Sequence, residues 1–215
     1  MNVKKSNSIW LLITAVLVIP FAAYAVVNWC EKKFSRLPVY GEAKEENGKK
    51  VPHSIASFSF TNQNATVYSN EAWKDKIVVC DFFFTHCPGI CPKLTMSLHK
   101  VQEAYKEDKN IIINSFTVDP AGDDAKTLNE YGERFKIDAA KWQLLTGEKK
   151  EIYKLARNSF MIVAADGDGG PGDFIHSEKL VLVDTHKRIR GYYNGTDEKE
   201  VTQLILDIKK LKHEN

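Results

Sequence analysis

Two cysteines that directly follow an apolar stretch are the residues of this sequence best suited to chemistry. Residues 78–93 read VVCDFFFTHCPGICPK, and Cys87 and Cys91 stand four positions apart in that stretch. We expect Pro88 in the first turn of a helix and Cys87 at its N-cap, so that both thiols share one face of the turn. Unpaired N–H groups at a helix N-terminus favour thiolate over thiol. The pair can therefore bind a soft metal such as Cu(I) or Zn, or form a disulfide that is either redox-active or purely structural.

A buried strand and the following helix must position these thiols. Residues 78–84 are apolar except for Asp81 and rich in β-branched and aromatic side chains, which is typical of a strand buried on both faces. Other strands are expected at 57–60, 65–68, 110–118, 142–145, 180–183 and 189–193, and helices at 92–107, 123–135, 148–160 and 197–211. The strand–helix–strand order implies a parallel crossover, and the hairpins add antiparallel strands. The sequence therefore predicts an α/β domain with a mixed central sheet.

The stretch FFFTHCPGICPKL resembles the signature of the Sco/SenC family, the thioredoxin-fold copper proteins linked to cytochrome c oxidase assembly. The family pattern is F-x-F-T-x-C-P-x-x-C-P, and the matching residues are Phe82, Phe84, Thr85, Cys87, Pro88, Cys91 and Pro92. Asp119-Pro120 and His176-Ser177 fit two further family positions, an Asp–Pro pair after the next strand and a histidine before the penultimate strand. The resemblance covers about residues 55–212 and implies a thioredoxin-like domain.

The resemblance also implies a copper site formed by Cys87, Cys91 and His176, which would hold one copper per domain as Cu(I), Cu(II) or both. Imidazole suits either oxidation state, and two thiolates select soft copper. The sequence departs from the family in two places. It reads DPAGDD where the family often has an arginine soon after the Asp–Pro pair, and Ile175 directly precedes the histidine where the family often has Asp. Asp173 lies two residues before Ile175.

Asp81, Asp119 and Asp173 are candidates for a supporting role beside these ligands or for proton exchange with them. The place of Asp81 resembles that of the buried aspartate behind the dithiol of thioredoxins, and burial would raise its pKa. The alternative is that Asp81 pairs with a lysine or a backbone donor. Asp119 ends the second buried strand at the carboxyl edge, where α/β sheets place their sites, or else it caps the following turn.

Other cysteines and histidines near the site have plainer interpretations. Cys80 is expected in the core, where a free thiol behaves as a small hydrophobic group. His86 is expected to be exposed, and a contact with the metal or a partner is its less favoured role. His53 is expected on the surface.

The N-terminal segment is expected to cross a membrane. Residues 9–29 form an uncharged run of 21 residues, close to the length that a spanning helix needs, with Trp10 and Trp29 near its ends. A cleaved signal peptide is the alternative, because residues 23–25 read AYA. We assign residues 1–30 to the anchor, the polar and charged segment 31–52 to a tether, and 53–215 to the Sco domain.

Composition and charge limit the remaining classes. The net charge of +2 with interspersed acids and bases excludes a nucleic-acid surface. Basic residues flank the apolar run on both sides, so the resemblance decides for an exported domain. The segment before the run is too short for a mitochondrial transit peptide. The prediction is a single-pass protein of the bacterial inner membrane with its C-terminal domain in the periplasm.

Two functions fit these residues. The first is a membrane-anchored copper chaperone that, as the resemblance implies, delivers copper to the dinuclear centre of cytochrome c oxidase subunit II. The second is a thiol-disulfide oxidoreductase acting on cysteines of that subunit or another exported protein. His176 discriminates between them, because a copper site needs it and a dithiol reductase does not. A thiol peroxidase is disfavoured, since its P-x-x-x-T-x-x-C pattern is absent.

Overall fold

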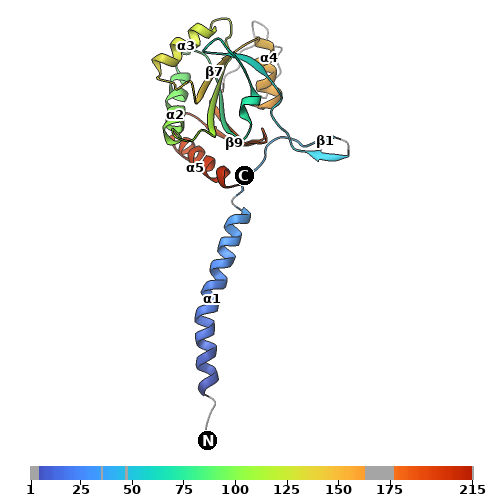
Figure 1. Cartoon of the computed structure of the whole chain (residues 1–215), viewed down its shortest axis with the longest axis vertical. Coiled ribbons are helices and arrows are strands. Elements are labelled where there is room, and N and C mark those ends of the chain that lie inside the picture. The colour runs from blue at the N-terminus through green and yellow to red at the C-terminus, as the bar shows by residue number, and fades with distance from the viewer. Residues whose placement is uncertain (1–4, 35, 47, 163–176, 215) are drawn as a thin grey trace. The chain divides into compact units, whose positions relative to one another are not determined.

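A seven-stranded sheet forms the centre of the unit Leu37–Asn215 in the computed structural model, which describes residues 5–34, 36–46, 48–162 and 177–214 (Figure 1). Its strand order is β4-β3-β7-β6-β5-β8-β9. The three strands β5, β6 and β7 are parallel, and all other neighbours are antiparallel. The strands are β3 Ser59–Asn62, β4 Val67–Ser69, β5 Ile77–Phe83, β6 Ile111–Thr117, β7 Trp142–Thr146, β8 Lys179–Val183 and β9 Ile189–Asn194. The predicted mixed sheet is confirmed.

Helices cover both faces of this sheet (Figure 1). Residues of α2, α3 and α5 share one hydrophobic core with one face, and α4 with the π-helical turn that follows it packs on the other. These elements are α2 Ile90–Ala104, α3 Ala125–Arg134, α4 Lys149–Lys154, the π-helical turn Leu155–Ser159 and α5 Glu198–Glu214, with a 3-10 turn at Asn70–Trp73. Each helix overlaps a range expected from apolar periodicity.

Strand β5 is buried along its whole length, as the sequence predicted. Its side chains alternate between the two cores, which follows from the two-residue period of a strand. Val79 and Phe83 lie in the core shared with α2, whereas Cys80 and Phe82 lie in the core on the other face. Cys80 is fully buried, in agreement with its expected core role. The end of β5 therefore leads the chain to the N-terminus of α2 at the carboxyl edge of the parallel strands.

In the described part of the unit Met1–Arg36 lies the helix α1 Lys5–Phe34, in which Pro20 is an interior residue. The predicted membrane span, residues 9–29, lies inside this helix. Among the described residues, however, no helix has both the length and the apolar character needed to cross a membrane. The structure therefore does not confirm the membrane anchor.

The segment expected as a tether, 31–52, includes the end of α1 and a short hairpin, β1 Lys44–Glu46 with β2 Lys49–Val51. The N–H of Tyr40 donates to the carbonyl oxygen of Ile189 at 2.9 Å. Arg190 donates to the carbonyl oxygens of Leu37 at 2.6 Å and Pro38 at 3.0 Å. Residues 37–40 are therefore bound to β9, while the assigned domain limits remain a prediction.

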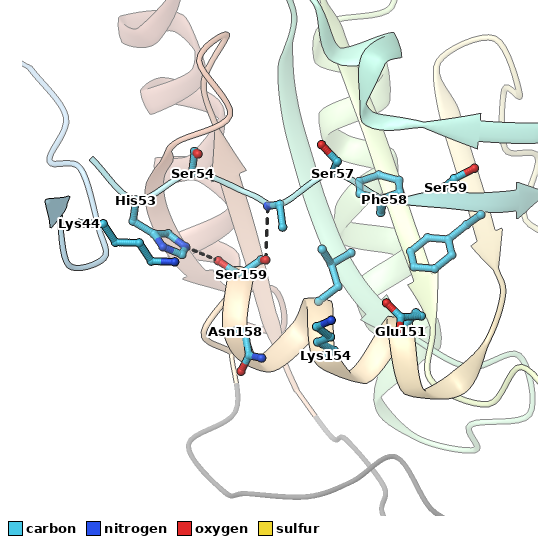
Figure 2. A pocket seen from close by; sticks show the side chains of 13 residues that line it. Lys44, His53, Ser54, Ser57, Phe58, Ser59, Glu151, Lys154, Asn158 and Ser159 are labelled. Carbon is cyan, nitrogen blue, oxygen red and sulfur yellow. Dashed lines mark hydrogen bonds between the residues drawn. The ribbon is translucent and has the colours of Figure 1, made fainter. Parts of the chain in front are cut away.

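A pocket of about 370 Å³ lies between residues 53–60 and the segment formed by α4 and the π-helical turn (Figure 2). There the His53 ring nitrogen Nε2 lies 2.7 Å from the carbonyl oxygen of Ser159, and the Ala56 N–H donates to the Ser159 hydroxyl at 3.3 Å. These contacts fix the end of the π-helical turn at Ser159, and residues 160–162 separate it from 163–176, which the structure does not describe. His53 is partly exposed, which agrees with its expected surface position, and its ring is held by a hydrogen bond.

Candidate metal centre

The two thiols lie where β5 passes into α2. A turn follows the strand, closed by the Cys87 N–H, which donates to the Phe84 carbonyl oxygen at 3.3 Å. The helix begins at Ile90, and its N-cap is Gly89. The predicted N-cap position of Cys87 is therefore wrong, because the turn uses Cys87 to close and leaves a Pro88–Gly89 bend before the helix. Pro92 occupies the first helical turn, where its missing N–H has no intrahelical partner in any case.

Cys87 nevertheless places its sulfur against the helix N-terminus. The N–H of Cys91 donates to the Cys87 sulfur at 3.5 Å. Burial opposes ionisation of Cys87, but hydrogen bonds from the backbone of Cys91, Gly89 and Ile90 and from the Cys91 side chain outweigh it, so the pKa of Cys87 is lowered. The predicted thiolate-favouring environment is thus confirmed for this cysteine, through the backbone amides of the first turn.

Cys91 has the opposite environment. Its residue is 3% exposed, and burial, together with the neighbouring Cys87, raises its pKa to about 12 despite a hydrogen bond from the Phe84 backbone. Both cysteines are free thiols in the structure. The Cys87 sulfur is therefore favoured as a thiolate. The Cys91 thiol keeps its proton until it binds a metal or forms a disulfide.

Asp81 lies on the β5 face that packs against α2, on the same side of the sheet as the two thiols. It is 2% exposed, and its Oδ1 has no hydrogen-bond partner among the described residues. Burial raises its pKa to about 7, although a hydrogen bond from Ser115 works against the shift. The expected rise is confirmed, and no lysine pairs with the carboxylate within the described ranges. Proton exchange with a thiol stays a prediction.

Asp123 is a buried acid at this edge that sequence reasoning assigned only to the start of a helix. Its carboxylate accepts hydrogen bonds from the Thr85 N–H at 3.1 Å, the Thr85 hydroxyl at 2.5 Å and the Thr117 hydroxyl at 2.5 Å. Asp124 is the N-cap of α3 instead and accepts from the Thr127 N–H at 2.8 Å. The sequence signal that could have indicated this role is the pair of adjacent acids Asp123 and Asp124. Only one of them can cap the helix, so the other needs a different partner.

Asp119 lies at the carboxyl edge as expected, and the turn that follows it is closed through its backbone. Its carbonyl oxygen accepts from the N–H groups of Gly122 and Asp123 at 3.0 and 2.9 Å. Its carboxylate lies over Gly122, where a Cβ would come within 2.7 Å of Oδ2. This arrangement matches the turn alternative for Asp119, and a supporting role beside the ligands stays a prediction.

The structure describes only one of the three remaining positions that the sequence linked to the site, His86, His176 and Asp173. The His86 side chain is 73% exposed, as predicted, and its Nδ1 lies 2.9 Å from the Thr85 hydroxyl. His176 and Asp173 lie outside the described residues. Within the described part of the chain, no three His, Cys, Asp or Glu residues gather as a metal site. The structure thus brings Cys87 and Cys91 together and leaves the third ligand untested.

Comparison with known proteins places this geometry in a family. The family model SCO1/SenC matches residues 46–213. The chain belongs to the SCO1/SenC family. Among curated relatives, the SCO1 protein homolog of Bacillus subtilis is 30% identical over 159 residues, which are 73% of this chain and 82% of that protein. The expected family assignment is confirmed.

Solved Sco structures share the fold. A SCO1/SenC family lipoprotein from Bacillus anthracis is 30% identical with a TM-score of 0.66, covering 74% of this chain and 95% of that chain. BsSco, described as a Sco family cytochrome c oxidase assembly protein with a disulfide switch, is 29% identical with a TM-score of 0.65 over 76% and 95%. Copper-bound Bradyrhizobium japonicum ScoI, at 24% identity, has the same fold with a TM-score of 0.60 over 74% and 99%. The domain is therefore a Sco-type, thioredoxin-like fold.

Proposed function

We propose that this protein is a Sco-type copper carrier that holds one copper through Cys87, Cys91 and His176 and serves cytochrome c oxidase assembly. The observation that carries the proposal is the contact between the Cys91 amide and the Cys87 sulfur, which keeps two thiols on one turn with Cys87 favoured as a thiolate. Thiolates are the ligands that select soft copper. Family membership supports the same role.

The two thiols take different parts in binding. Cys87, with its lowered pKa, offers a thiolate to the incoming ion. Cys91, whose pKa is raised to about 12, binds only as its proton leaves, so uptake should release a proton and weaken as the pH falls. A third ligand from His176 would complete the site, as the resemblance implies.

Metal analysis of the reduced protein reconstituted with Cu(I) tests the proposal. We expect one copper per chain, loss of binding in Cys87→Ser and Cys91→Ser, and weaker retention in His176→Ala. Cys80→Ser is the matched control, because Cys80 is buried in the core on the opposite face of the sheet. Full copper stoichiometry in both single cysteine variants of the site would refute it.

The acceptor that we propose is the dinuclear copper centre of cytochrome c oxidase subunit II. Support comes from the family and from the similar BsSco, which is described as belonging to a family of oxidase assembly proteins. Mixing the copper-loaded protein with the soluble, metal-free domain of subunit II should build the absorption of the dinuclear centre. The subunit II domain should also bind free Cu(I), which shows that it is competent as an acceptor. If it is competent but the copper stays on the loaded protein, this acceptor is contradicted.

Thiol-disulfide exchange is the second candidate, favoured by the asymmetry of the two thiols. Cys87 thiolate would attack a target disulfide and form a mixed disulfide, and Cys91, losing its proton, would then attack the Cys87 sulfur. The target leaves as a dithiol, and two electrons pass from the protein to it. His176→Ala separates the two functions, since it should reduce copper retention and leave the exchange rate unchanged.

We further propose that residues 1–30 anchor the protein in the bacterial inner membrane, with the Sco domain in the periplasm. Support comes from the uncharged run at 9–29 and from the likeness to a Sco family lipoprotein, which suggests a membrane-associated protein outside the cytoplasm. Protein carrying the segment should sediment with membranes after a carbonate wash, and protease added to spheroplasts should digest the domain. Release of the intact protein by carbonate would refute the anchor.

A further inference from the structure

The Asp123 carboxylate is connected to the cysteine turn more directly than any other acid at this edge of the sheet that the structure describes. It is 0% exposed and receives three hydrogen bonds, two from Thr85 and one from Thr117. Thr117 is the last residue of β6, and Thr85 is the second residue after β5. The carboxylate therefore joins the end of a rigid strand to the turn that carries Cys87.

The hydrogen bonds reach both the backbone and the side chain of Thr85. Because the N–H and the hydroxyl both donate to one carboxylate, neither the position nor the rotamer of Thr85 is free to change. The same turn is closed by the Cys87 N–H on the Phe84 carbonyl oxygen. Cys87 is thus held two residues from an anchored point, and its sulfur meets the Cys91 amide from there.

The hydroxyl of Thr85 also determines how His86 is held. Its single hydrogen goes to Asp123, so it can only accept from the His86 ring nitrogen Nδ1, which lies 2.9 Å away. The neutral ring then carries its hydrogen on Nδ1. The Asp123 carboxylate therefore binds Thr85 directly and contacts the exposed His86 ring only through the Thr85 hydroxyl.

None of three other described acids, Asp81, Asp119 and Asp124, has such contacts. The Asp119 carboxylate lies over Gly122, and Asp81 has an oxygen without a hydrogen-bond partner among the described residues. Asp124 is exposed and caps α3. Buried carboxylates persist where donors satisfy them, and two of the three hydrogen bonds to Asp123 come from the turn before Cys87.

We propose that Asp123 is the positioning residue of the dithiol, which fixes Thr85 and thereby holds the Cys87 sulfur against the first turn of α2. The assignment rests on the proposed chemistry of Cys87 and names the residue that prepares it. Asp123 itself touches no ligand sulfur in the described contacts, so it acts through Thr85.

Alkylation of the full-length, reduced and metal-free protein by iodoacetamide at pH 7.5 tests the proposal, with the label on each cysteine measured by mass spectrometry. The readout is the ratio of the Cys87 rate to the Cys91 rate in folded protein. Asp123→Asn replaces one acceptor oxygen by an N–H donor group that faces donors, so it should release Thr85. We expect the ratio to fall severalfold, because the Cys87 sulfur would no longer be held at the Cys91 amide that stabilises it.

Two matched substitutions at Thr85 separate positioning from general stability. Thr85→Ser keeps both donors and should retain the parent ratio. Thr85→Val keeps the shape but loses the hydroxyl, and should lower the ratio in the same direction as Asp123→Asn. This pair also keeps the test valid if Asp123→Asn does not fold. Asp124→Ala is the control for lost stability, since it removes the α3 cap and should leave the ratio unchanged.

Copper gives a second readout that distinguishes failure of this assignment from failure of the proposed function. If the parent binds copper, Asp123→Asn and Thr85→Val should weaken the Cu(II) thiolate charge-transfer band, and Thr85→Ser should preserve it. If the parent binds none, the copper function fails, and the alkylation ratio still decides the role of Asp123. Parent ratios in folded Asp123→Asn and Thr85→Val, or an equal fall in Asp124→Ala, would overturn the assignment.

Discussion

The backbone N–H of Cys91 donates to the sulfur of Cys87 at 3.5 Å, so one cysteine of the pair supplies the amide that stabilises the other as a thiolate. This contact arises because Cys87 lies before the helix and Cys91 within its first turn. The four-residue spacing therefore creates two unlike thiols. Cys87 has a lowered pKa, and Cys91 has a pKa of about 12.

Selective alkylation is the first consequence that can be measured. At pH 8, a limiting amount of iodoacetamide should label Cys87 and leave Cys91 almost unmodified, because only thiolates react at an appreciable rate. Denaturing the protein should equalise the two rates. The buried Cys80 is the internal control and should react only after unfolding. Faster labelling of Cys91 in the native protein would contradict the assigned environments.

Disulfide formation between the two site cysteines should compete with copper binding. Since a disulfide between Cys87 and Cys91 uses both thiolates, we expect the oxidised protein to bind no copper and to regain full binding after reduction. Thiol counting beside metal analysis measures this, and Cys80→Ser should change the thiol count by one without altering copper. Full copper stoichiometry after complete loss of both site thiols would show that the metal lies elsewhere.

The buried Asp81 should give stability an unusual pH dependence. Its pKa is about 7 in the folded protein, against 3.8 for an ordinary carboxyl group. Between these values the folded protein keeps a proton that the unfolded chain has lost, so the free energy of unfolding falls as the pH rises, and the loss is complete above pH 7. Asp81→Asn should therefore be more stable than the parent at pH 8, by up to about 4 kcal/mol, and equal to it near pH 4.

Urea unfolding at several pH values measures that difference, and Asp184 provides a control of opposite sign. Burial opposes ionisation of Asp184, but hydrogen bonds and charges from Arg188 and Arg190 hold its pKa below its usual range. The contribution of Asp184 to the free energy of unfolding is present at neutral pH and is lost as the pH falls. Asp184→Asn should therefore destabilise the protein most above pH 5. A gain from Asp81→Asn that does not change with pH would refute the assigned pKa.

We expect residues 37–40 to unfold together with the domain, because Arg190 binds this segment to β9. Arg190 is 4% exposed and pairs with Asp184 and Glu214 while donating to the carbonyl oxygens of Leu37 and Pro38. Arg190→Met removes one partner of a buried ion pair and should cost about 3 to 5 kcal/mol. Lys187→Gln, at a surface pair with Glu71, should cost less than about 1 kcal/mol.

Shortened proteins test the same contact without a substitution. A protein that begins at Leu37 should unfold at the temperature of the full-length domain. One that begins at His53 should unfold at a lower temperature, because it lacks the carbonyl oxygens of Leu37 and Pro38 to which Arg190 donates. Calorimetry measures both. Equal unfolding temperatures would show that residues 37–52 are a tether in solution.

Most of the sheet could be predicted because its strands and helices have regular apolar periods. The range 78–84 was expected for a strand found at Ile77–Phe83, and its even and odd residues fill different cores as the two-residue period requires. The contacts at the edge were harder to predict. Arg190 meets residues far away in the sequence, so the polar composition of 31–52 gave no sign that Leu37 and Pro38 are bound.

The site shows the same division between local and long-range information. The spacing of Cys87 and Cys91 was enough to predict two adjacent thiols, but the start of the helix was misplaced because the turn closure on Phe84 cannot be read from residue types. Asp123 was missed as a site residue because its donor Thr85 is 38 positions away. No local pattern distinguishes the adjacent acid that points inward from the one that caps the helix.

The alternation of side chains along β5 has a consequence for the chemistry of oxidation. Cys80 lies in the core on one face of the sheet, and Cys87 and Cys91 belong to the core on the other. The backbone layer between the two faces keeps Cys80 out of reach of any sulfur at the site while the domain stays folded. The folded domain therefore prevents disulfide exchange between Cys80 and the two site cysteines, and no oxidoreductase is needed to correct a wrong pairing. The domain can cycle between dithiol and disulfide many times without trapping a wrong disulfide.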